Sequence, residues 1–298
     1  MAFILKHLSK KNKKKYGDNP PWMQADYPVP DDLLEEFDVP YTGQDGASLA
    51  MDIYRLKEVD QDKLPVIIII HGGGLMVGHP RMERRVCEFF AREGYLVFAP
   101  GYRMVTEADG CGEIGDICDA FDFIAGELES YGGDPDKVNL IGESAGVFLG
   151  INAAAMMKSS RLCRLLGKEP AHLDIKAMAC VSGMFYITRK DIIGFLYPRE
   201  LFPDKRKNRR FMKSMNPENE DIMSKLPPLI LISSKADYLR NYTIRYSKAL
   251  RKARHSCRIV YYSDNKELVH AFATLKPEMI ESQDALKKII QWFEKYDQ

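Results

Sequence analysis

The sequence predicts an α/β fold built on a mainly parallel sheet, on three observations. The chain has 298 residues, of which 45% are apolar, enough to bury a sizeable core. From about residue 38, short apolar segments alternate with amphipathic segments of helical length, the rhythm of βα units. Glycine-rich turns directly follow two of the apolar segments, at Ile70 and Ile141, as expected where strands end at a functional edge.

Seven strands are expected in chain order. The most apolar, 66–70, is short and rich in β-branched residues, as is typical of a strand buried on both faces. Helices are expected between the strands, because apolar residues recur every three or four positions in 114–124 and again in 286–293. The expected strands are 50–54, 66–70, 95–99, 138–141, 177–181, 229–233 and 257–262.

The charge balance excludes several classes of partner. With 43 basic and 42 acidic residues, the chain lacks the net basic surface that nucleic acid or an anionic membrane requires. No apolar run approaches the roughly 20 residues of a membrane-spanning helix. The four apolar residues after Met1 are too few for a secretory signal. We therefore expect a cytoplasmic protein with no nucleic-acid partner and no membrane insertion.

The six cysteines show no C-x-x-C pairing, and several lie in apolar segments. This pattern favours reduced core thiols over disulfides or a metal site. We expect no metal and no cofactor. The six positions are Cys87, Cys111, Cys118, Cys163, Cys180 and Cys257.

Two stretches carry blocks of charge. Residues 1–20 carry six lysines and one aspartate, residues 21–40 carry six acidic residues and no basic one, and residues 204–213 carry six basic residues and one aspartate. Each block alone is typical of a solvated surface. A sharper hypothesis is that the acidic N-terminal segment packs near the basic insertion to form a small cap over the sheet. The basic residues concerned are Lys205, Arg206, Lys207, Arg209, Arg210 and Lys213.

The most informative motif is Gly142-Glu143-Ser144-Ala145-Gly146, which lies between a predicted strand and a helix-prone run. This is the G-x-S-x-G nucleophile elbow in the strand-turn-helix context that it requires. Small residues are needed on either side because the serine backbone is strained in so sharp a turn. Ser144 is therefore a candidate nucleophile.

A second motif, His71-Gly72-Gly73-Gly74, follows strand 66–70. Consecutive glycines present backbone N–H groups unobstructed by side chains, as an oxyanion hole demands. The N–H of Ala145 would complete the hole with Gly73 and Gly74, while His71 and Gly72 support the loop. A phosphate-binding loop is the rival use of such glycines, but neither phosphate-binding motif occurs here.

A serine nucleophile requires a histidine base and an acid, in the chain order Ser, Asp/Glu, His. Of the six histidines, His270 alone lies in a loop after the last predicted strand. For the acid, Asp237 follows strand 229–233 by a few residues. The candidate triad is Ser144, Asp237 and His270.

These motifs, in this order, resemble the hormone-sensitive-lipase-like carboxylesterases of the α/β-hydrolase fold-3 type. The resemblance covers about residue 38 to the C-terminus. Besides the motifs above, it rests on Tyr102-Arg103, Gly132-Gly133-Asp134-Pro135, Leu226-Pro227-Pro228, Asp237-Tyr238-Leu239 and His270-Ala271-Phe272.

The resemblance implies an α/β-hydrolase fold, with a mostly parallel eight-stranded sheet flanked by helices and a small helical cap. It implies an N-terminal cap segment at 1–40, a catalytic domain at 41–185 and 226–298, and a cap insertion at 186–225. It further implies hydrolysis of carboxylic esters without a cofactor, with the triad and oxyanion hole already named. Arg103 and Asp116 are expected to form a structural ion pair.

Two positions depart from the family's pattern. Tyr102-Arg103 runs into Met104-Val105-Thr106-Glu107, where the family usually has Leu-Ala-Pro-Glu, so a different loop shape is expected. Asn241 stands where the family often has Asp. Its amide would give weaker support than a carboxylate and would leave the triad intact.

The expected activity is that of a serine carboxylesterase acting on short- to medium-chain esters through an acyl-serine. The alternatives are a lipase acting on longer acyl chains, a serine peptidase, and a non-catalytic small-molecule-binding protein on the same fold. The chain is too short for the extra domains that would gate peptides, and the basic insertion does not suit an apolar lid. A homodimer is compatible with an exposed edge strand at the C-terminal end of the sheet.

Overall fold

The computed structural model describes residues 30–58, 63–169, 173–204 and 212–298, together with positions 4, 7, 10, 11 and 28. Most of the expected N-terminal cap segment lies outside the described residues, and so do the basic residues Lys205, Arg206, Lys207, Arg209 and Arg210. The described chain forms eight strands in one sheet, in the order β1-β2-β4-β3-β5-β6-β7-β8. The strands are β1 (Leu33–Thr42), β2 (Ser48–Leu56), β3 (Leu64–Ile70), β4 (Leu96–Pro100), β5 (Gly133–Glu143), β6 (Ile175–Val181), β7 (Leu229–Ser234) and β8 (Cys257–Tyr262).

The sheet is parallel from β4 to β8, whereas β2 runs antiparallel to both of its neighbours. The seven expected strands and the mostly parallel eight-stranded sheet are therefore confirmed. The carboxyl ends of the parallel strands share one edge, which positions the loops after β3, β5, β7 and β8 near one another.

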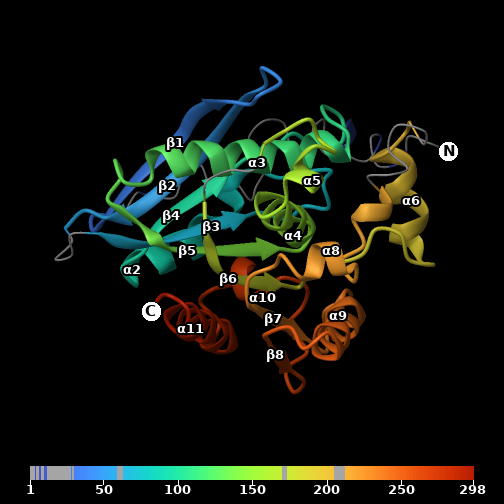
Figure 1. Ribbon diagram of the computed structural model, residues 1–298. Coiled ribbons are helices and arrows are strands. Elements are labelled where there is room, and N and C mark those ends of the chain that lie inside the picture. Colours follow the sequence, from blue (N-terminus) through green and yellow to red (C-terminus); the bar gives the residue numbers. More distant parts are fainter. Residues whose placement is uncertain are drawn as a thin grey trace.

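Helices cover both faces of the sheet (Figure 1). One face packs against α3 (Gly110–Glu127), α4 (Ala145–Met157) and α9 (Arg240–Lys252), and the other against α2 (Arg84–Arg92) and α11 (Ile280–Glu294). Strand β3 shows how the core divides, because Val66, Ile68 and Ile70 join the first cluster while Ile67 and Ile69 join the second. Its continuous apolar run is thus buried on both faces, as expected.

The ends of several helices follow from local sequence. Helix α3 begins at Gly110 because the Asp109 carboxylate accepts the N–H groups of Cys111 and Gly112. Helix α4 is apolar on all sides and buried along its whole length, so it forms the centre of the first core cluster. The stripe expected in 286–293 forms the buried face of α11.

The remaining helices are short or lie within the expected cap insertion. The short ones are α5 (Ser160–Cys163), α8 (Glu220–Met223) and α10 (Phe272–Leu275), and a 3₁₀ helix, η2 (Pro80–Glu83), precedes α2. Helix α6 (Ile192–Glu200) lies within the expected insertion, on the side toward which the parallel strands point (Figure 1). Among the described residues, no helix is long and apolar enough to cross a membrane.

Strand β1 was not expected, and it corrects the domain boundary at residue 40. Residues 33–40 pair with β2 and belong to the sheet. The strand escapes a pattern search because charged residues interrupt its alternation and because its register shifts between Glu36 and Val39, where Asp38 has a φ of 55°.

The hypothesis of an acidic segment paired with the basic insertion is wrong for three described acidic residues. Asp32 pairs with Arg92, Glu35 with Arg84 and Asp38 with Arg81. These partners belong to η2 and α2, which lie beside β1. The acidic residues therefore join an edge strand to a helix of the catalytic body.

Candidate active site

The turn between β5 and α4 holds Ser144 in a strained backbone conformation, with φ 50° and ψ −109°. Glycines make the turn possible. A Cβ at Gly146 would overlap the carbonyl oxygen of Ile70, and one at Gly142 would lie 2.7 Å from the Cα of Val147. The G-x-S-x-G motif thus forms the strand-turn-helix that its sequence predicts, with Ser144 at the start of α4.

Three side chains from distant parts of the chain meet beside this turn. The imidazole Nε2 of His270 lies 2.8 Å from Ser144 Oγ, and its Nδ1 lies 2.7 Å from Asp237 Oδ1. With the Nδ1 proton donated to Asp237, Nε2 is left to accept the Ser144 hydroxyl. The structure therefore brings together the three residues that the sequence singled out, in one chain of hydrogen bonds.

The Asp237 carboxylate is fully buried and well satisfied. It also accepts the N–H of Leu239 at 2.9 Å and the hydroxyl of Ser233 at 2.8 Å. Burial alone would raise its pKa, but the hydrogen bonds and the charge of His270 outweigh burial and lower the pKa below the ordinary value. Asp237 is therefore held ionised. Asn241, the departure from the family's pattern, is exposed on α9 and supplies none of these contacts.

The loop after β3 is built around positive φ angles, 95° at Gly73 and 63° at Gly74. Tyr102 ties the loop down, because its hydroxyl donates to the carbonyl oxygens of His71 at 3.0 Å and Gly72 at 2.9 Å. Within the part of the chain that the structure describes, the N–H groups of Gly73, Gly74 and Ala145 donate no hydrogen bond. Three backbone donors are thus left unused around Ser144.

His71 lies beneath this loop and is almost fully buried. Its Nδ1 lies 2.9 Å from the carbonyl oxygen of Gly72, and its ring stacks on Tyr102 with centroids 4.3 Å apart. Burial lowers its pKa to about 3, so the ring is neutral at physiological pH. These contacts suit the supporting role expected for His71.

Two residues at the site were quoted in motifs but given no role. The ring of Tyr238 packs over the imidazole of His270, with centroids 4.2 Å apart, and it is 67% exposed. Glu143, directly before Ser144, accepts the N–H of Gly72 at 3.1 Å through its Oε2. Only the folded structure reveals these partners, because residue 72 and residue 143 belong to different strand ends.

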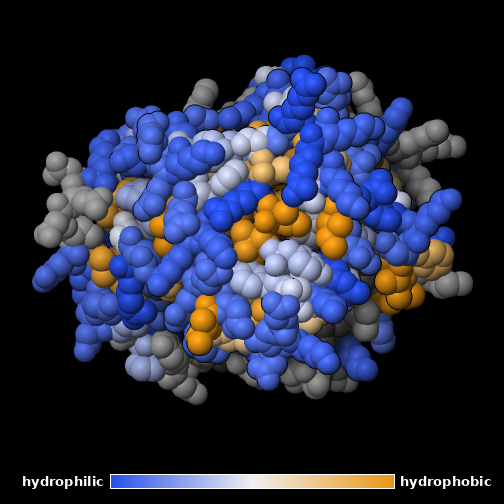
Figure 2. Space-filling model, turned by 90° about the horizontal axis from the view of Figure 1, so that it is seen from below, coloured by the Kyte–Doolittle hydropathy of each residue, from blue (hydrophilic) through white to orange (hydrophobic). Residues whose placement is uncertain are grey.

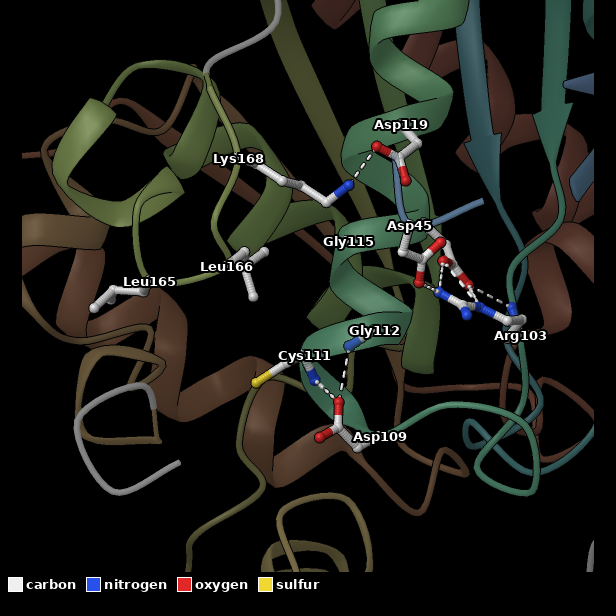
Figure 3. A pocket seen from close by; sticks show the side chains of 11 residues that line it. Asp45, Arg103, Asp109, Cys111, Gly112, Gly115, Asp119, Leu165, Leu166 and Lys168 are labelled. Atoms are coloured by element: carbon white, nitrogen blue, oxygen red, sulfur yellow. Dashed lines mark hydrogen bonds and ion pairs between the residues drawn. The ribbon is translucent and has the colours of Figure 1, made fainter. Parts of the chain in front are cut away.

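A separate cavity of about 210 Å³ lies along the outer side of α3 (Figure 3). The Arg103 guanidinium pairs there with Asp116 at 2.6 Å and with Asp45 at 2.8 Å, which confirms the expected structural ion pair. Lys168 pairs with Asp119 across the same cavity. None of the triad residues lines this cavity, and its two cationic side chains, those of Arg103 and Lys168, are both paired with lining carboxylates.

Comparisons with known proteins agree with this geometry. Esterase LipQ of Mycobacterium tuberculosis is 26% identical over 263 residues, covering 82% of this chain and 59% of that protein. Phenmedipham hydrolase of Pseudarthrobacter oxydans is 33% identical over 97 residues, which are 30% of this chain and 20% of that protein. The chain spans well under half the length of the first curated relatives that it matches.

Solved structures show the same fold. Esterase B from Lactobacillus rhamnosis, inhibited with a tributyrin phosphonate, superposes with a TM-score of 0.86 at 22% identity, covering 98% of this chain and 95% of that one. The esterase of Pyrobaculum calidifontis gives a TM-score of 0.73 at 21% identity, covering 98% and 93%. The BD-FAE family model matches residues 51–253, more than half of the chain. The chain therefore belongs to the BD-FAE family of α/β hydrolases.

Proposed function

We propose that this protein is a serine carboxylesterase in which Ser144 is the nucleophile, His270 the base and Asp237 the acid. The observation that carries the proposal is the hydrogen-bonded chain from Asp237 through His270 to Ser144, placed beside three unused backbone donors. The relatives named as esterases and hydrolases support it.

The reaction begins when Ser144 Oγ attacks the ester carbonyl carbon while Nε2 of His270 takes the hydroxyl proton. The carbonyl oxygen becomes an oxyanion, and the imidazolium then gives its proton to the departing alkoxide, which leaves as the alcohol. Water repeats the sequence on the acyl-serine and releases the carboxylic acid. Asp237 remains ionised throughout and stabilises the imidazolium.

The oxyanion is held by the N–H groups of Gly73, Gly74 and Ala145. Each such donor is worth roughly 3 kcal/mol of transition-state stabilisation in a site of this kind. Ala145 is also the first residue of α4, so the positive end of a 13-residue helix faces the developing charge.

Residues 186–225 form the cap insertion of our proposal, and its helix α6 contacts the oxyanion loop. The Tyr197 hydroxyl donates to the carbonyl oxygen of Gly74 at 2.9 Å. The start of the helix is held by Asp191, which accepts the Tyr242 hydroxyl at 2.7 Å. A cap fastened this close to the reacting carbon favours short- to medium-chain esters, and the tributyrin phosphonate bound to esterase B of Lactobacillus rhamnosis supports short acyl groups.

Replacing Ser144 with Ala tests the nucleophile. We expect Ser144→Ala to lose turnover of p-nitrophenyl butyrate while keeping the wild-type circular dichroism spectrum and melting temperature. Ser160→Ala is the matched control, because Ser160 is an exposed serine in α5 outside the site. Retention of wild-type esterase activity by Ser144→Ala would exclude this nucleophile.

A lipase acting on longer chains is the second candidate, because α6 exposes the apolar side chains of Ile192 and Phe195. A series of p-nitrophenyl esters of increasing acyl length separates the two functions. A maximum at short chains supports the esterase, whereas a maximum at long chains, raised further by emulsified substrate, supports the lipase. No turnover along the whole series would indicate a non-catalytic binding protein.

The proposal includes a cytoplasmic location and a homodimer. Strand β8 pairs only with β7 among the described strands, so its outer edge is open to a second copy. The side of the molecule seen in Figure 2 is mostly hydrophilic, with small separate apolar patches. Sedimentation velocity measures the oligomeric state, and a charged substitution of Tyr261 on β8 is expected to shift a dimer toward the monomer.

A further inference from the structure

Tyr238 carries an exposed aromatic ring directly beside the candidate triad. It follows Asp237 in the chain, and its ring packs against the imidazole of His270, with centroids 4.2 Å apart and planes at 34° to each other. The side chain is nevertheless 67% exposed. Small-molecule sites are lined with aromatic side chains of this kind, and a ring that is left exposed at a candidate site is available to a ligand.

The backbone holds this ring from both sides. The Asp237 carboxylate accepts the N–H of Leu239 at 2.9 Å, and the carbonyl oxygen of Asp237 accepts the N–H of Arg240 at 3.2 Å. Leu239 itself is buried. Tyr238 therefore projects from a fixed turn, and a site that is ordered before its ligand arrives loses less entropy on binding.

A buried serine joins this turn to the loop that carries His270. The Ser234 hydroxyl donates to the carbonyl oxygen of Leu268 and accepts the N–H of Asp237 at 3.1 Å. One side chain thus fixes the loop of the proposed base relative to the turn that carries Tyr238. The ring and the imidazole are held together as a unit.

Two aromatic side chains of α6 are less available to a substrate. Tyr197 is buried, and its hydroxyl donates to the carbonyl oxygen of Gly74. Phe195 is exposed, but the guanidinium of Arg199 covers its ring, 3.8 Å from the centroid. Of these three rings, Tyr238 is the one that is both exposed and packed against a triad residue.

The proposed reaction determines which part of an ester passes this ring. The departing alcohol oxygen takes its proton from Nε2 of His270, so it has to come within hydrogen-bonding distance of that nitrogen. The first carbons of the alcohol group then lie beside the same imidazole, next to the ring that packs on it. The acyl chain leaves the tetrahedral carbon along a different bond.

We propose that Tyr238 is a specificity-determining residue that contacts the alcohol part of the ester and favours aromatic alcohols. A flat aromatic group packs on an exposed ring in an offset or edge-on arrangement, which adds to the gain from the apolar area that it buries. The inference rests on the proposed esterase function and deepens it, because it names the half of the substrate that this residue selects.

Tyr238→Leu removes the ring and keeps an apolar side chain. The measurement is the ratio of kcat/KM for benzyl butyrate to kcat/KM for ethyl butyrate, two esters that share their acyl group. We expect the wild type to favour benzyl butyrate. In the variant the ratio should fall by about fivefold, the order expected for one aromatic contact, mainly through a higher KM for the benzyl ester. An unchanged ratio overturns the proposal.

Two further variants separate the ring from other effects. Tyr261 is also an exposed tyrosine, on β8, and among the described residues its ring contacts no triad residue, so Tyr261→Leu is the matched control and should keep the wild-type ratio. Tyr238→Phe keeps the ring and should also keep the ratio. A fall in Tyr261→Leu or in Tyr238→Phe as large as in Tyr238→Leu would contradict recognition by the Tyr238 ring.

Ethyl esters of different acyl length test which half of the substrate meets the ring. The ratio of kcat/KM for ethyl butyrate to kcat/KM for ethyl hexanoate should be the same in Tyr238→Leu and in the wild type, because the acyl chain lies away from the ring. A change in this ratio as large as the change in the benzyl-to-ethyl ratio would place the ring beside the acyl chain and overturn the proposal.

Binding of benzyl butyrate to Ser144→Ala tests the contact without turnover. In titration calorimetry, we expect Kd to rise by about fivefold when Tyr238→Leu is added. Equal Kd values contradict the contact. A wild type that hydrolyses neither ester, while Ser144→Ala still binds benzyl butyrate through Tyr238, contradicts the proposed function alone. Hydrolysis of both esters with a ratio that is unchanged in Tyr238→Leu overturns the inference alone.

Discussion

Single residues at the site owe their geometry to buried hydrogen bonds. Asp237 is the best example, because three donors and the charge of His270 keep it ionised in spite of full burial. The sequence predicted its identity from chain order, as it did for Ser144 and His270. It could not predict the partners of Glu143, because the position of a long side chain depends on which strand ends lie side by side.

Replacing Asp237 with Asn is a test at this scale. The amide fits the same space but can donate to Nδ1 of His270, which favours the tautomer that carries the proton on Nε2. We expect kcat to fall by about 10⁴ with little change in KM, as measured by steady-state kinetics. Ser233→Ala removes only one hydrogen bond to Asp237 and should cost far less. Similar kcat values for the two variants would contradict an orienting role for Asp237.

At the scale of elements, β1 shows what pattern reading misses. Strands buried on both faces, such as β3, were predicted from their apolar runs. Strand β1 lies at an edge, and its Glu35 faces helix α2 instead of solvent. The Glu35 side chain is fully buried against Arg84, at 2.6 Å. A carboxylate in a sequence usually indicates exposure, so only tertiary contacts reveal this strand.

Glu35→Ala tests that attachment. Removing Glu35 takes from the buried Arg84 one of its two carboxylate partners and leaves Glu88 at 3.1 Å as the other, so we expect a loss of about 1–3 kcal/mol in the free energy of unfolding. Chemical denaturation of the purified protein measures the loss. The control is Glu129→Ala, which breaks an exposed pair with Lys63 and should cost about 0–1 kcal/mol. Equal losses in the two variants would show that β1 is not held through Glu35.

For the whole molecule, buried carboxyl groups set how stability depends on pH. The folded-state pKa of Glu83 is raised well above 4.5, so the folded protein keeps a proton that the unfolded chain releases. Stability therefore falls as the pH rises from about 4.5 toward the folded pKa, since the folded state then binds more protons than the unfolded state.

Glu83→Gln should remove this loss. We expect the difference in melting temperature between the variant and the wild type to grow in favour of the variant as the pH is raised, in calorimetry across a pH series. Glu129→Gln, which changes an exposed carboxylate, should follow the wild type. A constant difference between Glu83→Gln and the wild type would mean that Glu83 is ionised in the folded protein.

Gly146 limits where the substrate choice of the proposed esterase can be altered. The start of α4 meets the end of β3 backbone against backbone, with no side chain between them to be varied. A side chain at residue 146 would overlap the Ile70 carbonyl oxygen, so the proposed nucleophile and the proposed oxyanion loop are held together as one rigid unit. Diversity in substrate choice then has to arise in segments that leave this contact alone, and α6 with its exposed Ile192 and Phe195 is the described segment most open to change.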